Sequence, residues 1–238
     1  MASPDVPQGA AGRFERELKF ELPEARVAFA RRLIERWCRP DAQYPAATVS
    51  TIYFDTPDHR LLGRKIDSDY YKAKVRLRWY TALEGRGAAE GSFLEVKERI
   101  GALRGKVRTP TPLRAAWLEQ ADLQRPEITA VLALLRPLGV PVPSRLLPAV
   151  MLRYRRYRFV EPLSGARLSL DTHIEVVRAH PRLLPPSHGP RLPLAVLEVK
   201  GDPADLPPLL RPLVRLGARR AAVSKFALAS RAILGRVW

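Results

Sequence analysis

The sequence predicts an α+β fold in which about eight β-strands form a barrel with a charged interior, and helices cover its outside. Three segments carry Glu and Lys two residues apart on an apolar background: Glu17-Leu18-Lys19, Glu95-Val96-Lys97 and Glu198-Val199-Lys200. A fourth, Lys74-Val75-Arg76-Leu77-Arg78, alternates with cations only. Because residues i and i+2 of a strand share a face, each segment has one charged and one apolar face. Any single charged face could be exposed to solvent, but the recurrence on several strands favours a charged interior.

Strand and helix signals alternate along the chain in an order that fits this architecture. β-branched, aromatic or alternating residues predict strands over 13–22, 49–54, 70–81, 92–99, 149–160, 166–177 and 192–200. Apolar residues at helical spacing, or Pro in a first turn, predict helices over 22–37, 59–65, 112–121, 126–138, 206–216 and 226–234. The connections include a Gly-rich hairpin loop at 85–91, a rigid linker at 141–148 and a Pro-rich loop at 181–193. Antiparallel pairing of 70–81 with 92–99 would place Arg76 and Arg78 beside Glu95 and Lys97.

Length, charge and cysteine content narrow the class of protein. The chain has 238 residues, which suits one domain over 13–238 after a flexible tail at 1–12. Its net charge of +17 would attract nucleic acid, polyphosphate, nucleotides or anionic membrane surfaces. Arg outnumbers Lys 33 to 8, which suits phosphate recognition but would equally follow from an Arg-rich genome. Cys38 is the only cysteine, so a disulfide framework is excluded and a reducing, cytoplasmic setting fits. No apolar run is long enough to predict a membrane span.

The first strand carries a candidate metal and phosphate site. Glu15, Glu17 and Lys19 fall on one face of this strand. Two carboxylates beside an ammonium suit Mn²⁺ or Mg²⁺ held together with a phosphate, because these ions prefer oxygen ligands and bridge phosphate oxygens. The alternative is a solvated edge strand with a favourable mixture of charges.

Two later strands add further charged faces. Tyr154, Arg156 and Arg158 share one face, and aromatic rings beside arginines also suit single-stranded nucleic acid. Arg167 and Asp171 share a face on the next strand. Asp171 could be a metal ligand, the partner of an arginine or a strand-end turn residue.

Ser224 and Lys225 precede the last predicted helix. Backbone amides at a helix start, a hydroxyl and an ammonium together form an anion site, although a plain N-cap serine is the alternative. The sequence contains neither a phosphate-binding Walker loop nor a dinucleotide-binding glycine pattern, and its four histidines lack metal-ligand spacing.

Eight segments, taken in order, carry a resemblance to a known family. They are RFERELKF (13–20), TIYFDT (51–56), KVRLRWY (74–80), FLEVKER (93–99), YRRYRF (154–159), RLSLDT (167–172), LEVK (197–200) and SKF (224–226). Together they resemble the polyphosphate polymerase domain of the vacuolar transporter chaperone (VTC) family. That domain belongs to the triphosphate tunnel metalloenzymes, which also include the CYTH proteins.

The resemblance implies a fold, a metal and roles for individual residues. The implied fold is an eight-stranded antiparallel tunnel with a basic interior. Catalytic roles fall to Arg76, Arg78, Lys97, Arg156 and Glu198. Phosphate binding falls to Lys19, Lys74, Tyr154, Arg167, Lys200, Ser224 and Lys225. Mn²⁺ or Mg²⁺ would be held by Glu198, with help from Glu15 and Glu17.

The resemblance also implies an activity. In the VTC family the tunnel transfers the γ-phosphoryl group of ATP to a growing polyphosphate chain, so we expect a polymerase whose partners are ATP and polyphosphate or inorganic phosphate. A metal-dependent triphosphate hydrolase on the same fold and a non-catalytic polyanion or nucleic-acid binder are the alternatives. Carboxylates interleaved with the lysines make nucleic acid the less favoured ligand. The regulatory SPX domain and the membrane segments of the eukaryotic complex are missing, so a stand-alone soluble form is expected.

Overall fold

The computed structural model describes residues 16–66, 70–83, 91–101, 103–185, 189–201 and 205–235. The strands are β1 (Arg16–Pro23), β2 (Arg39–Pro40), β3 (Ala46–Asp55), β4 (Tyr71–Thr81), β5 (Ser92–Ile100), β6 (Leu103–Thr111), β7 (Leu147–Val160), β8 (Arg167–Ala179), β9 (Leu194–Gly201) and β10 (Arg219–Arg220). The α-helices are α1 (Val27–Trp37), α2 (Arg60–Ile66), α3 (Ala115–Gln120), α4 (Pro126–Ala130) and α5 (Lys225–Leu234). The 3₁₀ helices are η1 (Glu24–Arg26), η2 (Val131–Leu138) and η3 (Pro208–Leu216).

The strands form one antiparallel sheet of ten strands. Its hydrogen-bonded order is β10-β1-β9-β8-β7-β3-β4-β5-β6, and β2 pairs with β7 outside this path. Within the described residues β6 pairs with neither β1 nor β10, so the sheet is not closed into a barrel. The predicted α+β fold with an antiparallel sheet is confirmed, whereas the prediction of eight strands in a closed barrel is wrong.

The composition of the two end strands explains why the sheet stays open. β6 contains Gly105 and Pro110 among cationic residues. Proline cannot donate a ladder hydrogen bond, and charged side chains disfavour further pairing, so such a strand suits a sheet edge. β10 consists of Arg219 and Arg220 alone, which is too short to bridge the gap.

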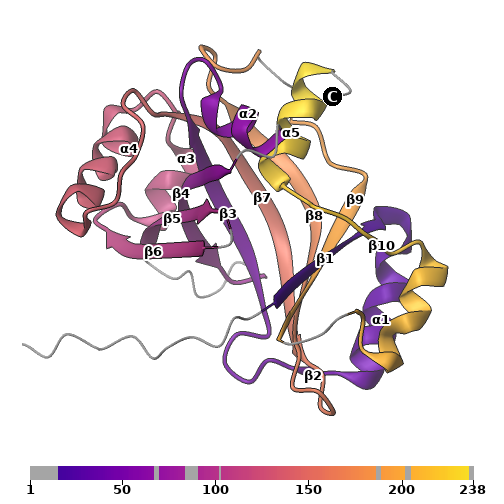
Figure 1. Cartoon of the computed structure of the whole chain (residues 1–238). Coiled ribbons are helices and arrows are strands. Elements are labelled where there is room, and N and C mark those ends of the chain that lie inside the picture. The colour runs from indigo at the N-terminus through magenta and orange to yellow at the C-terminus, as the bar shows by residue number, and fades with distance from the viewer. Residues whose placement is uncertain are drawn as a thin grey trace, which may run out of the picture.

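The sheet is nevertheless strongly curved (Figure 1). Side chains from β1 and β9, near one end of the strand order, line the same cavity as side chains from β4, β5 and β6 at the other end. The concave face of the sheet therefore wraps around a space that is bounded on several sides, although no hydrogen bonds close the ring in the described part of the chain.

The apolar, convex face of the sheet is covered by α1, α3, α4 and η3. At one end, Phe20 of β1 packs with Ile34 of α1 and Leu210 of η3. At the other, Leu77 of β4 packs with Leu118 of α3, and α4 extends the same cluster. Helix α5 instead packs on the concave side, where Phe226 stacks on Tyr53, the residue opposite Arg76. Figure 1 shows α1 beside β1 and β10, and α3 and α4 beside β4–β6. The alternating pattern of the strands therefore separates an apolar outer face from a charged inner one.

Several elements differ from the sequence-based expectation for identifiable reasons. The predicted helix at 126–138 begins as α4 but continues as the 3₁₀ helix η2, and the helix at 206–216 is the 3₁₀ helix η3. Each 3₁₀ segment contains an internal proline, Pro137 or Pro212, which cannot donate an α-helical hydrogen bond. β7 begins at Leu147, inside the predicted linker. Most of the predicted loop 85–91 and the whole tail 1–12 lie outside the described residues.

Membrane insertion through a helix is not indicated. None of the helices in the described residues combines the length and the apolar character needed to cross a bilayer.

Candidate functional site

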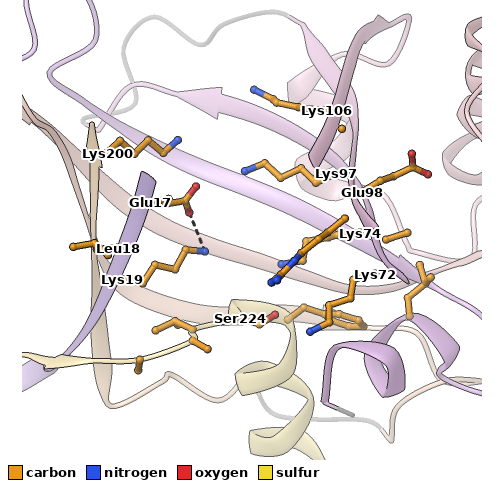
Figure 2. Close-up of a pocket in the computed structure, with 18 of the residues that line it drawn as sticks. Glu17, Leu18, Lys19, Lys72, Lys74, Lys97, Glu98, Lys106, Lys200 and Ser224 are labelled. Carbon is orange, nitrogen blue, oxygen red and sulfur yellow. Dashed lines mark ion pairs between the residues drawn. The ribbon is translucent and has the colours of Figure 1, made fainter. Parts of the chain in front are cut away.

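The concave face holds a cavity of about 800 Å³ that is lined by cationic side chains. Eight of the lining residues are Lys or Arg and two are Glu. Figure 2 shows Lys19 and Lys200 reaching into this space from one side, and Lys74, Lys97 and Lys106 from the other. Such a concentration of one sign of charge in a hollow calls for an anionic ligand.

Lysines gather at this cavity far beyond their share of the chain. The chain has only eight lysines, and six of them line the cavity: Lys19, Lys72, Lys74, Lys97, Lys106 and Lys200. A seventh, Lys225, lies buried beside it, since the neighbouring residues Ser224 and Phe226 are part of the lining. A genome bias toward Arg acts on the whole chain, so it does not explain why the rare lysines collect in one place.

Three of these lysines stand directly opposite one another across neighbouring strands. Lys74 of β4 faces Lys97 of β5, which in turn faces Lys106 of β6. Like charges in directly opposed positions destabilise a sheet. None of the three forms an ion pair with another residue in the described ranges. The row is therefore a place where a bound anion would remove a repulsion built into the fold.

The pKa values of two lysines in this row are also lowered, as expected for crowded cations. Burial, reinforced by the nearby Arg76, lowers the pKa of Lys97 from 10.5 to about 8. Burial and the charges of Lys19 and Arg76 lower the pKa of Lys74 well below its usual value. Both shifts mean that the charged lysines are less stable here than in water. An anion between them would reverse that penalty.

The next row along the same face is organised around Glu95. This carboxylate is only 2% exposed and accepts from Nε of Arg76 at 2.7 Å. Nη2 of Arg76 lies at 2.6 Å, Nη1 of Arg78 at 3.8 Å and Nε of Arg108 at 3.7 Å from Glu95 oxygens. Burial raises the pKa of Glu95, but the attraction of Arg76 and Arg78 outweighs it and lowers this pKa to about 2. Glu95 is thus an ionised counterion that fixes three guanidinium groups.

The observed register agrees in part with the predicted strand pairing. Arg76 lies opposite Glu95 as predicted, but Arg78 lies opposite Phe93, and Lys97 faces Lys74. Arg78 is buried and donates from Nε to the hydroxyl of Thr51 at 3.1 Å and from Nη2 to the hydroxyl of Tyr154 at 3.0 Å. These bonds hold the Arg78 guanidinium in a fixed orientation toward the concave side.

A second acidic centre lies near the start of α5. Asp171 accepts two hydrogen bonds from Arg156, at 2.6 and 2.7 Å, and lies 2.6 Å from Nζ of Lys225. Glu198 lies 3.6 Å from Lys225 and 3.7 Å from both Arg156 and Lys19. Of the three roles considered for Asp171, the structure shows the arginine partner. Burial lowers the pKa of Lys225, but Asp171 and Glu198 outweigh it and raise this pKa, so the buried ammonium stays charged.

Ser224 and Tyr154 complete this end of the site. Ser224 caps α5, since its hydroxyl accepts from the backbone amide of Ala227 at 3.5 Å, and it also lines the cavity. The ring of Tyr154 lies 5.1 Å from Nζ of Lys225 and 5.6 Å from Cζ of Arg156. The start of α5 thus brings a capped helix end, an ammonium and an aromatic ring to the cavity.

Two of the three predicted metal ligands come together. Glu17 and Glu198 lie on the paired strands β1 and β9, and Lys19 lies 3.1 Å from Glu17 and 3.7 Å from Glu198. Burial and the charge of Glu198 each raise the pKa of Glu17, but Lys19 and Lys97 help to lower it overall, so the carboxylate is ionised. Glu15 lies outside the described residues, among which no three His, Cys, Asp or Glu side chains group as a metal site. Glu17 and Glu198 therefore offer a partial oxygen set that substrate phosphates would have to complete.

Of the remaining predicted residues, Arg167 lies opposite Lys200 on β8 and β9, and its side chain is exposed. Two residues of the site, Glu95 and Lys106, were not among the predicted site residues, and Asp171 was considered with three alternative roles. The strand pairing shows which arginine each carboxylate meets, Arg76 for Glu95 and Arg156 for Asp171. Lys106 lies on β6, for which no strand was predicted, although Arg104, Lys106 and Arg108 alternate at the strand period.

Comparison with known families identifies the chain. A family model described as VTC domain matches residues 14–234. The chain belongs to the VTC domain family. The resemblance inferred from the ordered motifs is thereby confirmed. A search among curated proteins gave no match to this VTC domain.

Solved structures that match the chain include two proteins named as candidate adenylate cyclases. The one from Bacillus halodurans is 18% identical, with 79% of this VTC domain chain and 80% of that chain covered at a TM-score of 0.44. The one from Vibrio parahaemolyticus is 15% identical, with 94% and 99% covered at a TM-score of 0.44. A conserved hypothetical protein from Pyrococcus furiosus is 11% identical, with 85% and 89% covered at a TM-score of 0.41.

Proposed function

We propose that this protein is a polyphosphate polymerase that transfers the γ-phosphoryl group of ATP to a growing polyphosphate chain in its basic cavity. Membership of the VTC domain family supports a role in phosphoryl transfer or triphosphate binding. The observation that carries the proposal further is the division of the concave face into two differently built cationic zones.

The first zone is a set of arginines fixed by buried carboxylates. Arg76 is bound to Glu95 and Arg156 to Asp171, and Arg78 donates a hydrogen bond to the hydroxyl of Tyr154. Charge-assisted bonds from guanidinium groups suit the fixed, bidentate binding of one phosphate group. Phosphoryl transfer needs mainly positioning and charge neutralisation, which such a rigid zone supplies. We assign the triphosphate of ATP to it.

The second zone consists of lysines that form no ion pairs with other described residues: Lys72, Lys74, Lys97, Lys106 and Lys200. An ammonium on a flexible stem is a point charge without the planar geometry of a guanidinium, so it tolerates a phosphate chain in many positions. A hydrolase uses water as the acceptor and needs only the first zone. A polymerase also needs a place for the acceptor chain, and the lysine zone supports that reading.

The oxygens of Glu17 and Glu198 fit a divalent ion of the kind that this proposal requires. Mg²⁺ is commonly bound through one or two carboxylates together with substrate phosphates. When bound, Mn²⁺ or Mg²⁺ would neutralise charge on the phosphate oxygens. Glu198 would hold the ion, Glu17 and Glu15 would assist, and Lys19 between the carboxylates would contact the phosphate.

The proposal is tested by incubating the purified protein with γ-labelled ATP and Mn²⁺ and resolving the products on a gel. A ladder of phosphate chains with release of ADP is expected. The cavity variant Lys74→Met/Lys97→Met should lose the ladder, whereas Arg32→Met/Arg215→Met, which removes two exposed charges on α1 and η3, should keep it. Orthophosphate alone would show a hydrolase instead, and no turnover at all would indicate a polyanion-binding protein.

A further inference from the structure

Aromatic rings and guanidinium groups alternate in a row at one mouth of the concave face. We call this row, Phe93–Arg108–Tyr80–Arg158–Tyr44, the mouth row. Cζ of Arg108 lies 3.8 Å from the ring centroid of Phe93 and 5.8 Å from that of Tyr80. Cζ of Arg158 lies 5.7 Å from the ring centroids of both Tyr80 and Tyr44. Five planar groups from β4, β5, β6, β7 and the segment before β3 thus meet at one place.

The mouth row adjoins the arginine zone. Tyr80 follows Arg78 by two residues on the same face of β4, which places the two about 7 Å apart along the strand. Phe93 lies directly opposite Arg78 in the pairing of β4 with β5. Nε of Arg108 lies 3.7 Å from Glu95, the counterion of Arg76. A ligand whose phosphates lie on Arg76 and Arg78 would therefore extend its other end over the mouth row.

The groups of the mouth row are open to a flat ligand. Only the contact of Arg108 with Phe93 is as short as a stacking contact, and the other three are near the outer limit for a cation–π interaction. Tyr44 is 57% exposed, and Tyr80 and Phe93 are half-buried. A guanidinium group lies over each ring, but at Tyr80 and Tyr44 it stands 5.7–5.8 Å from the ring centroid, so another planar group could take its place on the ring face.

We propose that the mouth row binds the base of the nucleoside triphosphate by stacking, an inference that rests on the proposed use of ATP. Aromatic side chains and arginines bind nucleobases through their π-faces, and this mode tolerates every base. The triphosphate on Arg76 and Arg78 would then be anchored at its nucleoside end. ATP and GTP are expected to bind similarly, because stacking needs a ring surface more than a pattern of hydrogen bonds.

The test compares ATP with inorganic tripolyphosphate, each titrated calorimetrically into the full-length protein. Tripolyphosphate carries more charge and has no base, so electrostatics alone would favour it. Stacking of one base should make ATP bind about 5- to 150-fold more tightly than its phosphates alone would, which offsets that electrostatic advantage. Tyr80→Leu and Tyr44→Leu should lower the affinity for ATP and leave that for tripolyphosphate unchanged. Tyr80→Phe, which keeps the ring, should retain the affinity for ATP.

The control variant is Tyr70→Leu, which removes an exposed tyrosine elsewhere on the surface. It should not alter either affinity. Because Tyr44 is exposed, Tyr44→Leu should not disturb folding, and a loss of ATP affinity in this variant would therefore not be due to misfolding. If Tyr80→Leu and Tyr44→Leu leave the affinity for ATP unchanged, or lower it no more than that for tripolyphosphate, the inference is overturned and the proposed function stands. If neither ligand binds, the proposed function fails together with the inference.

Discussion

Replacing Lys97 by methionine should make the ligand-free protein more stable while it removes anion binding. Lys97 faces Lys74 and Lys106 across the sheet, and its pKa is lowered from 10.5 to about 8. At about 1.4 kcal/mol per pKa unit, this shift corresponds to a cost of roughly 3 kcal/mol for the charged form at pH 7. Solvent screens part of that cost because the side chain is only half-buried, so we expect a gain of about 1–3 kcal/mol. Methionine keeps the apolar stem and removes the charge.

The assay is urea unfolding at pH 7 in a buffer free of phosphate and sulfate, with the slope of the transition checked for each variant. Arg32→Met is the matched control, because Arg32 is exposed on α1 and its loss should change the free energy of unfolding by less than about 0.5 kcal/mol. Long-chain polyphosphate should stabilise the wild type much more than Lys97→Met. A variant that is less stable than the wild type and still binds polyphosphate equally well would refute the reasoning.

Further predictions concern the two carboxylate centres and pH. Glu95→Gln leaves three guanidinium groups without their buried counterion and should cost about 3–5 kcal/mol of unfolding free energy; the exposed Glu35→Gln should cost less than about 1 kcal/mol, and equal losses in urea unfolding would contradict the assignment. Glu198→Gln should abolish the dependence of turnover on Mn²⁺ or Mg²⁺, so an unchanged metal titration would remove Glu198 from the proposed metal site. Between pH 8 and 10.5 the unfolded chain binds more protons at Lys97 than the folded protein does, so stability from this group should rise with pH. The rise should be absent in Lys97→Met, and identical pH profiles for the two proteins would count against the shifted pKa.

The alternating strands could be predicted from the sequence because their chemistry is local. One charged and one apolar face follow directly from segments such as Glu17-Leu18-Lys19 and Lys74-Val75-Arg76. The structure places helices on the apolar side of these segments. The open sheet could not be predicted in the same way. Closure depends on whether β6 meets β1, and no local pattern reports the distance between two strands so far apart along the chain.

The site, too, has features that the local sequence predicts and features that depend on how distant strands are arranged. Cations such as Arg76 and Lys97 were recognisable from their spacing, but which of the three roles Asp171 plays was decided only by its pairing with Arg156 on the neighbouring strand. Lys106 was overlooked because glycine and proline in β6 are poor strand formers, and an edge strand tolerates both. The collection of the lysines at one cavity, the feature that best separates function from composition, appears only in three dimensions.

The most direct test of the central claim is the affinity for long-chain polyphosphate of two variants that lose the same charge. Lys74→Met/Lys97→Met removes two charges from the cavity, and Arg32→Met/Arg215→Met removes two from the exposed surface. Calorimetric titration at a fixed salt concentration should show at least a roughly 100-fold loss for the cavity variant, because two charge-assisted contacts contribute about 1.5–3 kcal/mol each. The surface variant should stay within a few-fold of the wild type. Equal losses in the two variants would mean that the overall charge, and not the lysine-lined cavity, binds the chain.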